Sequence, residues 1–192
     1  MQPVPPSHAR RTAASADPPA ESDAPLHSPG EASDPPGAST RPPSEPLEIV
    51  IGRALLETIE RQATRTAPEE CCGVLLGRRE RRRSIVDRVC PSPNVFDGDR
   101  TRRYTVDPRI AFEAFRDSRD SGRCVVGFYH SHTDGSTGPS RADTRAAWPD
   151  LFYLIVTLTD GRVTARKAWR MPQGTDSFRE EILTCTDGCV TV

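Results

Sequence analysis

Apolar residues recur from residue 47 onward at spacings that predict both strands and helices. Residues 47–51 alternate between apolar and polar as a half-buried strand does, and the apolar residues of 53–65 recur at helical spacing until Pro68 ends that helix. Asp107 followed by Pro108 is typical of the first positions of a helix, which Gly122 then ends. The folded part of the chain therefore contains elements of both kinds.

The remaining elements follow from the same patterns. Further strands are predicted at 70–77, 84–90, 103–106, 124–129, 151–158 and 162–169, and further helical segments at 140–148 and 178–183. Strands and helices are mixed without strict β-α-β alternation. The expected fold class is therefore α+β, with a mixed β-sheet and helices packed on its faces.

The first 46 residues differ in composition from the rest. They hold 12 of the 19 prolines and no Phe, Tyr or Trp. Such a segment cannot bury enough apolar surface to offset the entropy of ordering it. We therefore predict a disordered, Pro-rich tail over 1–46 and one folded domain over 47–192. A tethering or docking role for the tail is an alternative to a merely solvated segment.

The charge balance argues against several functions. With 26 Lys and Arg against 27 Asp and Glu, the chain lacks the basic excess of a protein that binds nucleic acid through phosphate contacts. No apolar run is long enough for a transmembrane helix, and no apolar stretch follows Arg10-Arg11 to make an export signal. We expect a cytoplasmic protein without membrane or nucleic-acid partners.

The six cysteines are scattered and form no C-x2-C pair, which is typical of a reducing compartment. Cys71, Cys72 and Cys124 lie in apolar, strand-like runs, so we expect them to be unreactive core residues. Cys185 and Cys189 have the spacing of a weak metal pair, but no further ligands accompany them.

Two histidines are the first candidates for chemistry. His130 and His132 lie two residues apart at the end of an apolar run, and side chains at i and i+2 of a strand share one face. A single buried histidine is more often structural. Two that converge on one point favour a metal site.

Ser140 and Asp143 complete the motif H-x-H-x7-S-x2-D. Taken alone, this pair indicates a capping box at the start of a helix. A helix start that points at the strand end would also place Asp143 beside the histidines. Two imidazoles and one carboxylate make a three-ligand zinc site with the fourth position open, whereas a structural zinc site needs a fourth protein ligand.

A hydrolase with such a site also needs a general base. Glu69 and Glu70 are the candidates, because both precede an otherwise apolar strand. Solvation of the strand end explains at least one of them. A strand sends the two side chains to opposite faces, so the pattern alone leaves the choice open.

An upstream Glu followed by H-x-H-x7-S-x2-D resembles the JAMM (MPN-plus) metalloprotease family, over roughly residues 47–170. The family's Glu sits in a P-x-E-x-C-G-like strand, which selects Glu70. The resemblance implies that His130, His132 and Asp143 bind one Zn²⁺ per chain. It implies that Glu70 is the acid/base residue and that Ser140 stabilises the oxyanion. It also implies a cytidine-deaminase-like fold, with a mixed sheet between helices.

The compact domain is similar to the short bacterial branch of that family. The partners of this branch are small ubiquitin-like sulfur-carrier proteins that end in Gly-Gly. The resemblance therefore implies a zinc peptidase or isopeptidase that cleaves at the carrier's C-terminal glycine and releases cysteine or a related adduct. Two alternatives are a non-catalytic MPN-type scaffold that binds partner proteins, and a general peptidase of other peptides.

Overall fold

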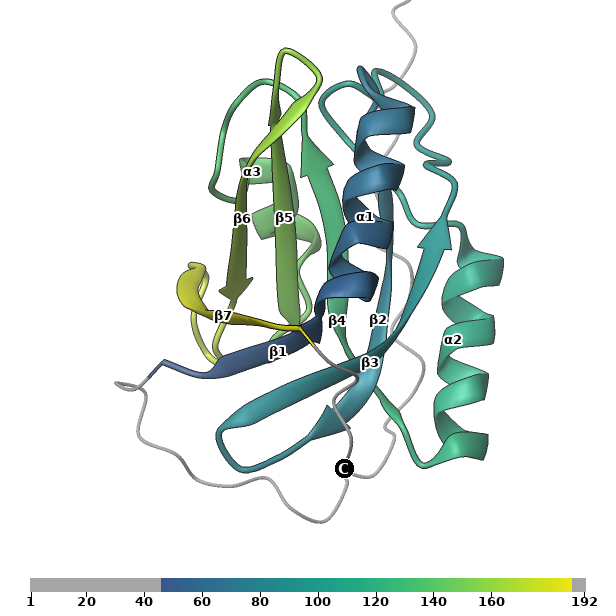
Figure 1. Ribbon diagram of the computed structural model, residues 1–192, viewed down its shortest axis with the longest axis vertical. Helices are drawn as coiled ribbons and strands as arrows, with labels where there is room; N and C mark the ends of the chain where they lie inside the picture. Colours follow the sequence, from purple (N-terminus) through teal and green to yellow (C-terminus); the bar gives the residue numbers. More distant parts are fainter. Residues whose placement is uncertain (1–45, 188–192) are drawn as a thin grey trace, which may run out of the picture. The chain divides into compact units, whose positions relative to one another are not determined.

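The computed structural model describes residues 46–187, which form a mixed β-sheet with three helices (Figure 1). The predicted disordered tail and Cys189 lie outside the described residues, apart from Pro46. The strands are β1 (Glu48–Gly52), β2 (Cys72–Arg79), β3 (Arg83–Ser92), β4 (Cys124–His132), β5 (Phe152–Thr159), β6 (Arg162–Arg170) and β7 (Arg179–Thr186). The helices are α1 (Arg53–Thr66), α2 (Pro108–Ser121) and α3 (Arg141–Ala146).

The strand order is β1-β3-β2-β4-β5-β6-β7, and the sheet closes on itself because β7 pairs with β1. Three neighbouring pairs are parallel: β1 with β3, β1 with β7, and β4 with β5. The other pairs are antiparallel. The predicted mixed sheet is therefore confirmed, and its closure is a feature that the sequence patterns did not indicate.

Helices α1 and α2 pack against opposite faces of the sheet. Leu56, Ile59 and Ala63 of α1 are buried in the larger core with Leu75 of β2. The neighbouring β2 residue Val74 belongs to the second core, together with Ala114 of α2. Adjacent residues of one strand thus face different helices, as the two-residue period of a strand requires.

Gln62 anchors α1 to three strands from within the core. Its side-chain amide donates to the carbonyl oxygens of Cys72 and Ser92, at 3.2 and 3.1 Å. Its side-chain oxygen accepts a hydrogen bond from the Tyr129 hydroxyl at 2.5 Å. Every polar atom of this buried amide is therefore engaged, which stabilises the end of β4 that leads into the histidines.

The predicted helical turn at 178–183 is wrong, because residues 179–183 belong to β7. There, Ile182 lies opposite Glu48 of β1, and Glu181 lies opposite Ala168 of β6. The buried Glu181 carboxylate accepts from the Arg170 guanidinium at 2.9 Å and from the backbone N–H of Leu47. Pairing with two strands overrides the local helical propensity of the glutamates.

The strand predicted at 103–106 is also wrong, since Val106 forms only an isolated bridge with Asn94. The Asn94 side chain takes the hydrogen bonds that a neighbouring strand would make. Its oxygen accepts from the Thr105 N–H at 3.1 Å, and its NH₂ donates to the Arg103 carbonyl oxygen at 3.0 Å.

The other elements appear close to their expected positions. β2 begins at Cys72 rather than at residue 70, and α3 covers Arg141–Ala146. Among the described residues, no helix is long and apolar enough to cross a membrane.

Candidate metal centre

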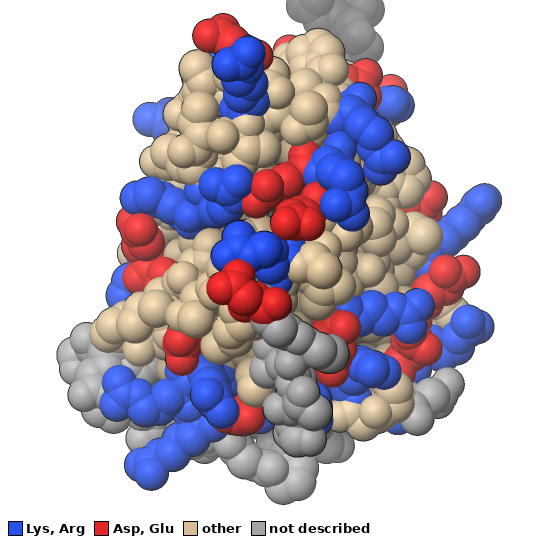
Figure 2. Space-filling view, viewed as in Figure 1, with Lys and Arg blue, Asp and Glu red and all other residues tan. Residues whose placement is uncertain are grey.

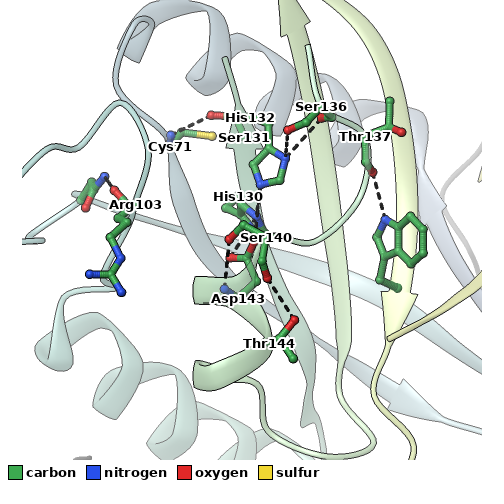
Figure 3. Close-up of polar contacts among 12 residues, drawn as sticks. Cys71, Arg103, His130, Ser131, His132, Ser136, Thr137, Ser140, Asp143 and Thr144 are labelled. Atoms are coloured by element: carbon green, nitrogen blue, oxygen red, sulfur yellow. Dashed lines mark hydrogen bonds and ion pairs between the residues drawn. The ribbon is translucent and has the colours of Figure 1, made fainter. Parts of the chain in front are cut away.

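Both histidines lie at the C-terminal end of strand β4, within the sheet. His130 lies opposite Cys72 of β2 and Ile155 of β5, so the strand is held from both sides at this point. His130 is fully buried and His132 is 4% exposed. Their Nε2 atoms lie 3.1 Å apart (Figure 3), so the two rings meet at one point as their spacing predicted.

Asp143 approaches that point from the first turn of α3. The Ser140 Oγ accepts from the Asp143 N–H at 3.1 Å, and the Asp143 Oδ2 accepts from the Ser140 N–H at 2.6 Å. This is the predicted capping box. Asp143 Oδ1 also lies 3.5 Å from His130 Nε2, and Oδ2 lies 3.5 Å from His132 Nε2. The Asp143 carboxylate therefore takes part in the capping box of α3 and also faces both imidazoles.

The three side chains fit a tetrahedral cation. Their ligand atoms lie within 4.8 Å of one another, and all three residues are buried. With metal–nitrogen bonds of 2.0–2.1 Å, the edge of a tetrahedron is about 3.3 Å. The two Nε2 atoms are 3.1 Å apart, and each lies 3.5 Å from a different oxygen of the Asp143 carboxylate, distances close to this value. His130, His132 and Asp143 could therefore hold a metal ion.

The protonation states also suit a cation. Burial would raise the pKa of Asp143, but hydrogen bonds from the two histidines and Ser140 lower it well below its usual range. Burial lowers the pKa of His130. Burial also acts to lower the pKa of His132, but Asp143 outweighs it and raises that pKa. An ionised Asp143 and a neutral His130 are the forms that bind metal.

The Nδ1 atoms of the two histidines, which point away from Asp143, have different surroundings. His132 Nδ1 lies 3.2 Å from the Ser136 carbonyl oxygen and 2.9 Å from its Oγ, contacts that leave Nε2 free to face Asp143. His130 Nδ1 is buried and has no hydrogen-bond partner within the part of the chain that the structure describes. Instead, the Tyr104 ring stacks on His130, with centroids 4.4 Å apart.

Glu70 lies just before β2, and three hydrogen bonds hold the backbone of this segment in place. Its N–H donates to the Arg100 carbonyl oxygen at 2.8 Å, and its carbonyl oxygen accepts from the Asn94 side chain at 3.1 Å. The next N–H, of Cys71, donates to the Ser131 Oγ at 2.8 Å, which ties this segment to the residue between the two histidines.

Glu70 is 5% exposed, and its carboxyl interacts electrostatically with His132 and Asp143. Burial raises the pKa of Glu70 to about 7; His132 acts to lower it, and Asp143 raises it. A carboxyl with a pKa near neutrality can both take up and release a proton at the pH of a cell. Glu69, by contrast, is exposed to solvent.

The buried cysteines have no part in the centre. Burial raises the pKa of Cys71 to about 11 and that of Cys72 to about 12, so both are neutral thiols at neutral pH. Cys185 is exposed on β7. The sequence patterns did not single out Ser131, Ser136 or Tyr104 as supports of the site. The position of Ser131 between the two histidines was the one available signal.

The comparisons with known proteins point to one family. The model of the Prok-JAB family, described as prokaryotic homologs of the JAB domain, matches residues 52–172. A desampylase from Haloferax volcanii is 39% identical over 114 residues, which cover 59% of this chain and 76% of that protein. A probable TtuB-protein conjugate cleaving protease from Thermus thermophilus is 34% identical over 128 residues, or 67% and 79% of the two chains.

Two further matches agree. A CysO-cysteine peptidase from Mycobacterium tuberculosis is 30% identical over 127 residues, covering 66% of this chain and 84% of that protein. The solution structure of a protein from Desulfitobacterium hafniense aligns with a TM-score of 0.65 and 29% identity, covering 74% of this chain and 95% of that one.

The range that the family model matches contains Glu70, Ser140 and the three residues around the candidate cation site. It covers more than half of the chain, and the relatives are named as peptidases or conjugate-cleaving enzymes. The predicted resemblance and fold are thereby confirmed: the chain belongs to the Prok-JAB family, the prokaryotic homologs of the JAB domain, and is a hydrolase.

Proposed function

We propose that the domain is a zinc-dependent peptidase that cleaves at the C-terminal glycine of a ubiquitin-like sulfur-carrier protein and releases cysteine or a related adduct. The convergence of His130, His132 and Asp143 within 4.8 Å carries this proposal. The names of the relatives support the substrate class, since they refer to conjugates of TtuB and to CysO-cysteine. We assign the activity to a domain that spans residues 47–192.

Zinc bound by these three residues would act as a Lewis acid on the scissile carbonyl and would bring the pKa of water down to about 7. Glu70, with its pKa near 7, takes a proton from the attacking water and then donates it to the departing amine. The Ser140 hydroxyl accepts a hydrogen bond from the Asp143 N–H, and its own proton is available for the developing oxyanion. The backbone contacts of Glu70 hold this residue in place just before β2.

The proposal is tested with the full chain and a Gly-Gly-ending ubiquitin-like carrier ligated to cysteine. Intact mass spectrometry follows the loss of cysteine, and elemental analysis measures bound zinc. We expect about one zinc per chain, hydrolysis at the glycine, and loss of activity on chelation.

Glu70→Gln separates catalysis from metal binding. This variant should bind zinc like the wild type and lose a factor of about 10²–10⁴ in rate. Near-normal turnover of the zinc-loaded variant would refute the role of Glu70. A wild-type protein without bound zinc and without activity would favour the alternative of a non-catalytic scaffold.

A further inference from the structure

An open groove of about 530 Å³ begins at the proposed oxyanion residue. Ser140 and Arg141 line it at the start of α3, and Phe96, Arg102 and Arg103 line it from the loop between β3 and α2. We name it the arginine groove. Because Ser140 lines the groove and is hydrogen-bonded to Asp143, the groove borders the candidate metal centre.

The guanidinium groups of the arginine groove form no salt bridge with any described residue. Arg102, Arg103 and Arg141 are exposed, and none of them has a carboxylate within 4.0 Å among residues 46–187. Arg103 lies over the Phe96 ring at 5.2 Å, which holds its charge at the groove. In Figure 3, the Arg103 side chain extends beside the centre rather than into it.

One acidic residue, Asp99, also lines the groove. Its carboxylate accepts hydrogen bonds from the N–H and the hydroxyl of Thr101, at 3.0 and 2.6 Å. These hydrogen bonds, and to a lesser extent the charge of Arg102, lower the pKa of Asp99. Asp99 can therefore offset one of the three positive charges and leaves a local excess of two. On the face that carries α1, positive and negative side chains are intermixed (Figure 2). The local excess suits an anionic ligand.

The geometry of the proposed reaction decides which end of the substrate enters the groove. Glu70 must reach the departing amine, so the released group lies on the Glu70 side. The groove is lined by Ser140 and not by Glu70. The acyl side of the scissile bond, which is the tail of the carrier, therefore extends into it.

We propose that the arginine groove binds the carrier tail just before its Gly-Gly end and selects tails with acidic side chains there. This inference rests on the proposed hydrolysis of carrier conjugates. It adds a property that the zinc chemistry does not require, because within residues 46–187 no hydrogen bond or ion pair joins these guanidinium groups to His130, His132 or Asp143. The substrate class is a ubiquitin-like carrier with an acidic tail.

The test uses three forms of one Gly-Gly-ending carrier ligated to cysteine. The two residues before Gly-Gly are Glu-Glu, Gln-Gln or Arg-Arg. At low salt, kcat/KM should fall in that order, with about a tenfold or greater difference between the extremes, carried mainly by KM. The difference should shrink as salt is added, because exposed charges are screened.

The double variant Arg103→Glu/Arg141→Glu should reverse the order and favour the Arg-Arg tail. Arg81→Glu is the matched control, since Arg81 lies in the turn between β2 and β3, at the far end of β2 from His130. The control should keep the wild-type order. Thermal unfolding and zinc content of both variants verify that the fold and the centre are intact.

The outcomes separate the two proposals. Equal hydrolysis of all three tails would overturn the groove inference and leave the proposed function standing. A tail preference that survives in the double variant would also overturn it. If the wild type hydrolyses none of the three, the proposed function fails, and the inference fails with it.

Discussion

The Tyr104 ring stacks on the His130 imidazole, with ring centroids 4.4 Å apart and planes inclined by 22°. Metal-binding histidines usually gain their orientation from a hydrogen bond at the outer nitrogen. His132 has such contacts with Ser136, and His130 has none within the described residues. The stacked aromatic ring takes the place of that hydrogen bond in fixing the His130 ring.

Replacing Tyr104 with Leu should therefore weaken zinc binding by about tenfold, the lower end of the effect of losing an outer partner of a ligand. Tyr104→Phe keeps the ring and should bind zinc like the wild type. Competition with a chromophoric chelator measures both affinities. Equal affinities for Tyr104→Leu and the wild type would show that the sheet alone orients His130.

Glu70 should make the metal-free protein less stable as the pH rises. Burial raises the pKa of Glu70 to about 7, above the value of 4.5 expected for an exposed glutamate. Between these two pH values the unfolded chain releases a proton that the folded chain retains, so the free energy of unfolding decreases with pH and levels off above 7.

Glu70→Gln removes this dependence. In the presence of a chelator, the variant should exceed the wild type in stability by about 1–3 kcal/mol at pH 8 and by much less at pH 5. Urea unfolding at the two pH values measures the difference. A constant difference at both values would contradict the shifted pKa.

Ser140→Ala should lower both stability and rate. The N-cap hydrogen bond to the Asp143 N–H is lost, which costs about 1 kcal/mol. Loss of the hydroxyl donor should cost a factor of about 10²–10³ in kcat. Ser140→Thr retains a hydroxyl at the same place and should recover most of both. If Ser140→Ala lost stability but kept the kcat of the wild type, Ser140 would have no role in stabilising the oxyanion.

The cysteines should differ sharply in reactivity. Cys71 and Cys72 are buried thiols whose pKa values are raised to about 11 and 12, whereas Cys185 is exposed. Iodoacetamide at pH 8 should modify Cys185 within minutes and leave the buried pair intact until the chain unfolds. Peptide mapping by mass spectrometry before and after denaturation reads out each site. Modification of Cys71 in the native protein would contradict the burial of this segment.

The sequence predicts what depends on local spacing. The two-residue period of β4 placed both histidines on one face, and the capping pattern of Ser140 and Asp143 set the start of α3. Glu70 could not be told from Glu69 by pattern, because its burial comes from packing against distant residues. The family resemblance selected it instead.

Long-range pairing set the limit of what the patterns predicted. The segment of β7 contains glutamates that favour a helix, but it forms a strand because it pairs with β1 on one side and with β6 on the other. The Tyr104–His130 contact joins a residue from a loop to a residue from a strand, and the hydrophobic pattern of the sequence does not predict such a contact. Local patterns therefore predict the ligand set better than the side chains that support it.

The Asp143 carboxylate completes the capping box of a helix of only six residues, which is too short to persist by itself. The same oxygen atoms face the two imidazoles. A lineage that abandoned catalysis and replaced this aspartate with an apolar residue would also lose the hydrogen bond from the Ser140 N–H, and with it half of the capping box of α3. Asn, which can still accept the backbone hydrogen bond, is therefore the least disruptive first step by which such a domain could decay into an inactive descendant.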